Sequence, residues 1–350
     1  MIKRALVNKT TRIALIKLAA IGDVTMACRA LSEIASRYET GFEIHWFIDE
    51  RLQPLANALL TSEFAGAHFN VEWHPVNSTK LFQGSRGEKI REALRIFKAV
   101  AMIRPSYIAL LHRDWRYKAL LRFAFTGRLF TLAGRGSHEI DTYTRCLEKL
   151  ARSMRLAPHP VERSRTRLIT PSGRIGVLVG GAQNQKLTYE EKRWPHLAHF
   201  IELVLSRSDR KIALFGGPDD KALAEKIMRG VSQQDRVENL VGRYQLDELP
   251  EKLAALDAFV GIDSGPAHIA AAVMTAPHQR IISLFGPTDP LVWVPRANGA
   301  ARLSLLYKAP ECSPCYQDDG NFKPCPLVGD RFRHCMNEIT AEEAYDALSN

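Results

Sequence analysis

Several features are missing from this sequence of 350 residues, and each absence excludes a class of protein. No apolar run approaches the roughly 20 residues that a membrane-spanning helix requires. The first residues lack the apolar block and cleavage site of a secretory signal peptide. Neither the G-x-G-x-x-G fingerprint of dinucleotide-binding proteins nor the phosphate-binding P-loop pattern is present. We therefore expect a cytoplasmic globular protein with no transmembrane segment.

The composition is that of an ordinary globular protein with a basic surplus. Hydrophobic residues make up 46% of the chain and charged residues 25%. A chain of 350 residues is longer than a domain with a single hydrophobic core usually is, which predicts two domains. The net charge of +10 favours an anionic partner, such as a nucleic acid, an acidic membrane surface or a phosphorylated substrate. The basic residues are scattered, and no RNA-binding pattern with interleaved aromatics accompanies them. We therefore do not expect nucleic acid as the partner.

Short apolar runs alternate with helix-length amphipathic segments along the whole chain, which predicts an α/β fold. Strands are predicted at 13–18, 43–48, 107–111, 174–179, 211–215, 258–262 and 280–285. Helices are predicted at 23–38, 88–102, 115–125, 142–155, 220–229 and 246–256. A proline-rich stretch at 157–160 and a polar segment after it divide the two series.

The pattern predicts two doubly wound, Rossmann-like domains, residues 1–170 and 171–337, with an inter-domain cleft. We expect the last helix, within 338–350, to pack back on the first domain.

The segment from Phe259 to His268 is the most informative part of the chain. An apolar strand ends at Asp263, a Ser264-Gly265-Pro turn follows, and an alanine-rich helix begins at once. This order directs the unpaired N–H groups and positive dipole end of the helix at whatever lies above the strand, and a phosphate suits that place. His268, on the first turn, can reach the same ligand. The alternative is an ordinary strand-to-helix connection.

The first strand ends in a comparable turn, Gly22-Asp23. The Asp23 carboxylate can accept N–H groups of the first helical turn as a cap. It can also act as a general base that removes a proton from an acceptor hydroxyl in the cleft. The two roles are compatible.

Two glycine turns in the second half complete the set of candidate ligand sites. Gly181 lets a ligand approach the backbone closely, and Lys192 can reach a phosphate. Asp220, or Asp219 beside it, follows another glycine turn and can cap a helix or accept ribose hydroxyls. The alternative is a turn with a surface lysine and a capping aspartate.

Four cysteines lie close together near the C-terminus, in the segment 312–335. Their spacing is C-x2-C-x9-C-x9-C, which offers enough thiolates for a tetrahedral zinc or iron site; they are Cys312, Cys315, Cys325 and Cys335. Such a metal would be structural, because all four ligand positions would be filled. The alternative is four reduced thiols in a loop.

Taken in order, these motifs resemble glycosyltransferase family 9, the lipopolysaccharide heptosyltransferases. The most specific of them are Asp263-Ser-Gly265 with His268, and the stretch from Leu284 to Pro290 that reads LFGPTDP. The resemblance implies a GT-B fold, with the acceptor on the first domain and the nucleotide-sugar on the second. It also implies an ADP-heptose donor and an inverting reaction that needs no catalytic cofactor.

The resemblance assigns roles to individual residues. It makes Asp23 the catalytic base, and it gives the donor a set of contacts that consists of Gly181, Lys192, Asp220, Asp263, Ser264, Gly265 and His268. An acceptor contact is also predicted for Gly22. Arg113 and Arg116 are predicted to contact the acceptor because they lie near the end of the strand 107–111 in the basic first domain. The acceptor implied is a phosphorylated glycolipid, the lipopolysaccharide inner core, at the inner membrane surface, where the enzyme would be peripheral.

Two alternatives to this function stay open at the level of sequence. The same fold can glycosylate a protein, as the enzymes that modify autotransporters do, or a different glycan. A more remote alternative is a zinc-containing nucleic-acid-binding protein, which the basic charge and the cysteines suggest.

Overall fold

The structure is a computed structural model, and it describes most of the chain. The described residues are 11–38, 42–63, 70–113, 117–118, 121, 127–134, 136–158, 169–181, 183–184, 187–188, 190–316 and 324–349.

The N-terminal half is built on a five-stranded parallel sheet with the order β3-β2-β1-β4-β5. Its strands are β1 (Thr11–Ile16), β2 (Phe42–Asp49), β3 (Asn70–Val76), β4 (Tyr107–Leu110) and β5 (Arg128–Thr131). Its helices are α1 (Ile21–Ala35), α2 (Gln53–Ala58), the π-helix η1 (Leu59–Glu63), α3 (Ser78–Gln83), α4 (Arg86–Ile103) and α6 (Glu139–Ser153).

The C-terminal half is built on a six-stranded parallel sheet with the order β10-β9-β6-β11-β12-β13. Its strands are β6 (Arg174–Leu178), β9 (Lys211–Phe215), β10 (Val237–Asn239), β11 (Ala258–Ile262), β12 (Arg280–Phe285) and β13 (Arg302–Tyr307), and β7 (Gln183–Asn184) and β8 (Leu187–Thr188) form a small hairpin. Its α-helices are α7 (Leu197–Arg207), α8 (Lys221–Gly230), α9 (Leu249–Ala254), α10 (Gly265–Val273), α11 (Pro290–Trp293), α12 (His334–Asn337) and α13 (Ala341–Asp346). Its 3-10 turns are η2 (Glu190–Lys192), η3 (Pro218–Asp220), η4 (Gln234–Arg236) and η5 (Gly329–Arg331).

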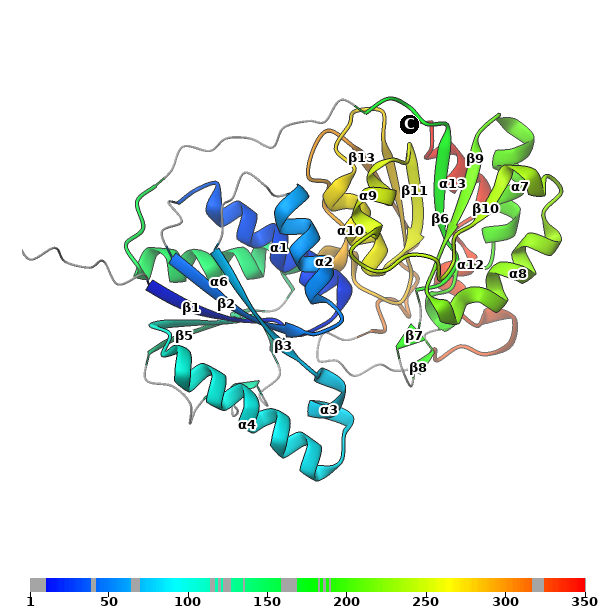
Figure 1. Cartoon of the computed structure of the whole chain (residues 1–350). Coiled ribbons are helices and arrows are strands. Elements are labelled where there is room, and N and C mark those ends of the chain that lie inside the picture. Colours follow the sequence, from blue (N-terminus) through cyan, green and yellow to red (C-terminus); the bar gives the residue numbers. More distant parts are fainter. Residues whose placement is uncertain are drawn as a thin grey trace, which may run out of the picture.

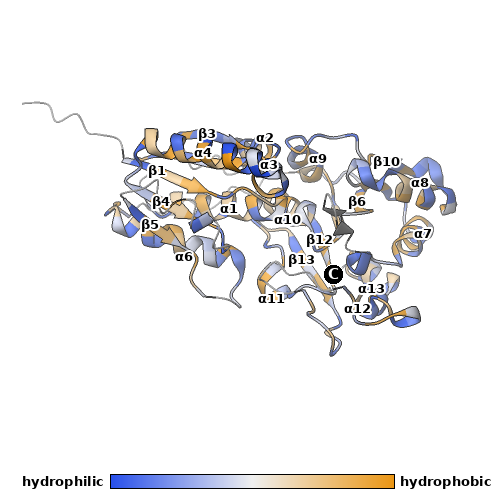
Figure 2. Ribbon diagram, turned by 90° about the horizontal axis from the view of Figure 1, so that it is seen from below, coloured by the Kyte–Doolittle hydropathy of each residue, from blue (hydrophilic) through white to orange (hydrophobic). Residues whose placement is uncertain are grey.

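Helices cover both faces of each sheet, as the alternating sequence pattern predicts (Figure 1). In the N-terminal half, α1 and α6 pack on one face, and α4 covers the buried side chains of the other. In the C-terminal half, α9 and α10 lie on the face toward the N-terminal half, and α7, α8 and α13 lie on the opposite face (Figure 1). Helix α10 is largely hydrophobic, whereas the outer helix α8 is largely hydrophilic (Figure 2).

The two halves meet through α1 and α10, whose side chains join one continuous apolar core. Two polar contacts add to this junction. His138 Nε2 lies 2.7 Å from the carbonyl oxygen of Val294, and Arg296 Nη2 donates to Asp141 Oδ2 at 2.8 Å. The starts of α1 and α10 are therefore held beside one another.

Each predicted strand coincides with an observed one to within about two residues, but the last helix is placed differently from our expectation. Helix α13 packs on α7 in the C-terminal half, not on the N-terminal half. The reason lies just before it, where Trp194 Nε1 donates to the carbonyl of Ile339 at 2.7 Å. This buried hydrogen bond holds the chain against the C-terminal domain as α13 begins.

Among the helices that the structure describes, none combines the length and the apolar character needed to cross a bilayer.

Candidate functional site

The start of α1 brings Asp23 to the carboxyl end of β1. Asp23 Oδ2 accepts the backbone N–H of Ala20 at 2.9 Å, so this carboxylate does cap its own helix. Two further groups reach it from outside the helix. The Tyr143 hydroxyl donates to Oδ1 at 3.1 Å, and Lys17 Nζ lies 3.3 Å from Oδ2. The carboxylate is fixed in place, and its side chain remains 22% exposed.

Lys17 and Tyr143 are members of this site that sequence reasoning missed. Lys17 is only 4% exposed, and its ammonium lies 5.0 Å from the centre of the Tyr143 ring. Burial, reinforced by the negative charges of Asp23 and Glu139, raises the pKa of Tyr143 well above its ordinary value. The hydroxyl therefore stays protonated and donates to Asp23. A lysine directly after an apolar strand was the available signal for Lys17.

The start of α10 carries the second part of the site. Asp263 follows β11, and its Oδ2 lies 2.9 Å from Lys192 Nζ, which η2 supplies from another part of the chain. Burial alone would raise the pKa of Asp263, but the charge and hydrogen bond of Lys192 outweigh it and the pKa is lowered. The pair is therefore ionic. Lys192 is held by Asp263 at the edge of the sheet and is not a free surface lysine.

His268 lies between the two helix starts. It is 6% exposed, and burial lowers its pKa to about 4 although Asp263 and Asp23 both act to raise it. The imidazole is therefore neutral near pH 7, with one nitrogen able to donate a hydrogen bond and the other to accept one.

The close approach of α1 and α10 depends on two glycines. A Cβ on Gly22 would lie 2.9 Å from His268 Cδ2, and a Cβ on Gly265 would lie 2.5 Å from Ile21 Cγ2. Neither position has room for a side chain without a shift of its neighbour. The structure thus brings Gly22, Asp23, Gly265 and His268 together, although they come from different halves of the chain.

Gly181 and Ser264 extend this region along the sheet edge. Gly181 has φ +89°, which favours glycine, and a Cβ there would lie 3.2 Å from Ser264 Cβ. The Ser264 hydroxyl donates to the carbonyl of Ile262 at 3.0 Å. Ser264 is also the N-cap residue of α10, and its carbonyl accepts the N–H groups of Ala267 at 3.2 Å and His268 at 3.4 Å. Pro266 has no N–H, so the Gly265 N–H is the donor of the first turn closest to this region.

Asp220, but not Asp219, faces this part of the molecule. Asp220 is 5% exposed, and its Oδ2 accepts the N–H of Gly217 at 2.9 Å. A Cβ on Gly180 would lie only 1.8 Å from Asp220 Oδ1, so the carboxylate occupies the space that a side chain would take. Oδ1 is buried and has no hydrogen-bond partner among the residues that the structure describes. Asp219 is exposed.

Arg113 does not project freely toward an acceptor as expected. Its Nη2 donates to Glu139 Oε2 at 2.8 Å, and its Nη1 donates to the carbonyl of Gly134. The side chain is therefore engaged within the N-terminal domain. Arg116, the second residue predicted to contact the acceptor, lies outside the described residues.

The four-cysteine segment packs against Glu191, beside Lys192, and against the loop after β12. The Cys315 N–H donates to the Pro287 carbonyl at 3.0 Å, and the Cys325 N–H donates to Glu191 Oε1 at 3.2 Å. Burial, with contributions from the other three thiols, raises the pKa of Cys335 to about 12. The thiols are thus near enough to influence one another.

The sulfur atoms are nevertheless not at ligand spacing. In the described part of the chain, the only His, Cys, Asp and Glu side chains grouped in threes at metal-ligand spacing are those of His45, Glu72 and His74. A metal held by the four cysteines would require this segment to close further.

Two doubly wound parallel α/β domains that meet at their helix starts define the GT-B fold. Solved structures with the same fold superpose on nearly the whole chain. The glycosyl transferase family 9 structure from Veillonella parvula has a TM-score of 0.66 at 18% identity and covers 97% of this chain and 96% of its own. E. coli heptosyltransferase WaaC with ADP-2-deoxy-2-fluoro heptose has a TM-score of 0.65 at 17% identity, covering 97% and 99%.

Sequence comparison finds similarity to the same family in the C-terminal half. Residues 176–324 match the family model of glycosyltransferase family 9 (heptosyltransferase). Lipooligosaccharide heptosyltransferase 2 of Haemophilus influenzae is 35% identical over 119 residues, which is 33% of this chain and 33% of that protein. The alignment thus spans about a third of the relative's length. The C-terminal half of this chain is thus similar to glycosyltransferase family 9, the family that the sequence motifs resemble.

Proposed function

We propose that this chain is a heptosyltransferase of lipopolysaccharide biosynthesis. It would move a heptose from an ADP-heptose donor to a hydroxyl of an inner-core acceptor, with inversion at the anomeric carbon. The observation that carries the proposal is the junction of α1 and α10, where a carboxylate from one half lies beside the helix start of the other. The family match and the ADP-sugar bound by a protein of the same fold support the choice of donor.

The donor diphosphate would lie at the start of α10. Helix N-termini bind phosphate through free N–H groups and the positive dipole end, and Lys192 adds a positive charge near the same edge. Asp263 holds Lys192 in place by its ion pair. Neutral His268 can donate one hydrogen bond to a phosphate oxygen without carrying charge.

The adenosine ribose would lie near Asp220. Its buried Oδ1 has no partner among the described residues, so it can accept a ribose hydroxyl after a small local shift. Gly180 and Gly181, which adjoin Asp220 and Ser264, would let the nucleotide approach the backbone.

Asp23 would act as the general base for the acceptor. A carboxylate offers about four lone-pair sites, so after the contacts to Ala20, Tyr143 and Lys17 it can still accept an acceptor hydroxyl. In the reaction the acceptor oxygen bonds to the anomeric carbon, the bond from that carbon to the diphosphate breaks, and the hydroxyl proton passes to Asp23. Attack from the face opposite the leaving ADP gives inversion.

The acceptor is proposed from charge and from the family. The net charge of +10 suits an inner-core glycolipid that carries phosphate and acidic sugars. Because Arg113 is paired with Glu139, we do not assign it a strong acceptor contact. The transfer assay described below can also be run with a protein or another glycan as the acceptor, and transfer to one of these would change the assigned acceptor. The family match removes the support for a nucleic-acid-binding protein.

A structural zinc or iron on the four cysteines remains a separate proposal. The thiols gather beside Glu191 and the 286–288 loop, so a metal there would brace the donor side of the site. Transfer itself is proposed to need no catalytic cofactor.

The test is a transfer assay with ADP-heptose and inner-core lipopolysaccharide that lacks the receiving heptose. We expect Asp23→Asn to lose about 10²- to 10⁴-fold in kcat, the usual contribution of a general base. Asparagine keeps an oxygen for the Ala20 cap but leaves buried Lys17 without its charge partner, so we expect a lower melting temperature. The thermal shift caused by ADP-heptose should be retained.

The matched control is Tyr143→Phe, which removes one hydrogen bond to Asp23 but leaves the base in place. We expect its loss of kcat to be far smaller. If Asp23→Asn retains most of its activity, Asp23 is not the base; if the unchanged protein transfers no sugar from ADP-heptose, the proposed reaction is wrong.

A further inference from the structure

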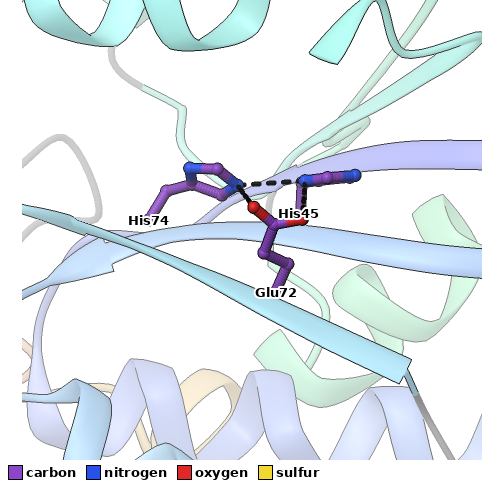
Figure 3. A group of neighbouring side chains, drawn as sticks. All are labelled: His45, Glu72 and His74. Atoms are coloured by element: carbon purple, nitrogen blue, oxygen red, sulfur yellow. Dashed lines mark hydrogen bonds and ion pairs between the residues drawn. The ribbon is translucent and has the colours of Figure 1, made fainter.

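Three side chains of metal-ligand type come together on the N-terminal sheet, away from the proposed transferase site. In the parallel register of β2 and β3, His45 lies opposite Glu72, and Phe47 lies opposite His74. Residues two apart on a strand share one face of the sheet, so His45, Glu72 and His74 project from the same side. Figure 3 shows the two imidazoles and the carboxylate turned toward one another.

The distances between the three ligand atoms match a tetrahedral metal site. His45 Nδ1 lies 3.0 Å from His74 Nε2 and 3.3 Å from Glu72 Oε2, and His74 Nε2 lies 3.8 Å from Glu72 Oε1. Zinc bonds of about 2.0–2.1 Å in tetrahedral geometry place neighbouring ligand atoms about 3.3–3.4 Å apart. The observed spacings lie on both sides of that value, so a zinc ion would need only small shifts.

Either tautomer of His45 places a nitrogen lone pair beside a carboxylate. If Nδ1 carries the proton and donates to His74, the lone pair of Nε2 faces the Glu43 carboxylate at 3.5 Å. If Nε2 carries the proton, Nδ1 accepts from His74 Nε2 at 3.0 Å, and the Glu72 carboxylate lies 3.3 Å from the same nitrogen. A metal ion bound to Nδ1, His74 and Glu72 would replace this contact between a lone pair and a carboxylate by coordination of both.

The outer contacts favour a metal ligand at His45. With Nδ1 bound to a metal, Nε2–H points toward Glu43, whose Oε2 also accepts Arg12 Nε at 3.2 Å. Metal-ligating histidines commonly donate their other N–H to a carboxylate in this way. His74 is held from its other side, because its ring stacks on Phe47 with centroids 4.7 Å apart.

Solvent reaches the group at Glu72 and, to a smaller extent, at His74, whose side chain is 19% exposed. His45 is 3% exposed, whereas the side chain of Glu72 is 56% exposed. A metal ion could therefore enter past Glu72 and keep a water in its fourth position, as three-ligand zinc sites do. His45 lies in the middle of β2 and not at its carboxyl end, where ligands of such sheets bind. This position favours a structural role.

We propose that His45, Glu72 and His74 bind a zinc-class divalent cation that ties β3, the edge strand of the N-terminal sheet, to β2. The site is independent of the four cysteines and of sugar transfer. Because the ion would bind the folded chain, it would stabilise the N-terminal domain in proportion to its affinity.

The test uses the full chain after treatment with a chelator, followed by dialysis against Zn²⁺ at neutral pH. Elemental analysis gives zinc per chain, and X-ray absorption distinguishes nitrogen and oxygen ligands from sulfur. We expect one zinc with nitrogen and oxygen ligands and a higher melting temperature. Glu72→Gln and His74→Gln should each weaken zinc binding by more than about tenfold. Mutation of residues that only hydrogen-bond to metal ligands already lowers metal affinity by about 10- to 100-fold.

His199→Gln is the matched control, since its side chain is 56% exposed and lies on α7. It should bind zinc as the unchanged protein does. Glu72→Gln keeps the test decisive if His74→Gln fails to fold, because the Glu72 side chain is largely exposed. Zinc bound only through sulfur, or equal nitrogen- and oxygen-ligated binding by Glu72→Gln, would overturn the proposal.

Discussion

Two lysines near the junction of the two halves are each paired with a carboxylate. Lys17 lies beside Asp23, and Lys192 lies beside Asp263. Leaving one member of such a pair alone in the interior would cost several kcal/mol, on the order that isolated buried charges cost. His268 avoids this cost differently, because burial keeps it neutral.

The neutral state of His268 makes stability depend on pH. Its pKa falls from 6.5 to about 4 on folding, so between these values the unfolded chain binds more protons and stability falls as the pH falls. From about pH 7 to about pH 5 this one group should remove about 2 kcal/mol from the free energy of unfolding. Urea unfolding of the unchanged protein and of His268→Gln at both pH values measures the difference.

His199→Gln serves as the comparison, because it removes an exposed histidine of the same type. We expect its pH dependence to equal that of the unchanged protein, whereas His268→Gln should lose about 2 kcal/mol less on acidification. Identical pH dependence in all three proteins would show that His268 is not buried in the neutral form.

At the scale of elements, the sequence predicts strand-turn-helix units well and contacts between distant units poorly. The turns after β1 and β11 are recognisable because an apolar strand, a glycine or serine turn and an amphipathic helix follow in order. Each turn lies at the carboxyl end of a strand of its own sheet, where parallel sheets bind ligands. Tyr143 escapes prediction, since nothing local to α6 indicates that it reaches Asp23 across 120 residues.

Strand β3 shows a different reason for failure. Its residues Asn70–Val76 include a proline and two titratable side chains, so the segment lacks an apolar run. As the edge strand of the sheet it tolerates both. The spacing of Glu72 and His74, two apart on a strand, was the available signal for the metal-ligand group.

The contact between the starts of α1 and α10 can be tested with Gly265→Ala. Its Cβ would lie 2.5 Å from Ile21 Cγ2 and 3.2 Å from the backbone nitrogen of Gly22, so the helices must separate. We expect a loss of about 1–3 kcal/mol in the free energy of unfolding, as for overpacked cores. Donor binding, measured by thermal shift with ADP-heptose, should weaken as well.

Gly230→Ala is the control for the same substitution in the same half. Gly230 ends α8 and has no atom within 4 Å of an added Cβ. Its stability should change by less than about 1 kcal/mol, with unchanged donor binding. Equal behaviour of the two variants would mean that α1 and α10 do not depend on their close approach.

For the whole molecule, the contact between the two halves centres on α1 and α10. Interfaces between domains of one chain commonly permit relative motion. In the function proposed above, donor and acceptor bind between the two halves, so such motion would open and close the site. The polar contacts that cross the junction, His138 to Val294 and Arg296 to Asp141, lie beside the α1–α10 contact. They can therefore bias the relative position of the halves with little effect on either core.

Arg296→Ala separates these two effects. The Arg296 and Asp141 side chains are 41% and 43% exposed, so their ion pair should contribute less than about 1 kcal/mol to folding. Because the pair joins the halves, its loss should nevertheless change the KM for the donor by about two- to fivefold, the equivalent of about 0.4–1 kcal/mol. Arg174→Ala breaks a similarly exposed pair with Glu238 inside the C-terminal half and should leave the KM unchanged. If both variants change KM alike, the effect is one of surface charge, and the junction does not govern donor binding.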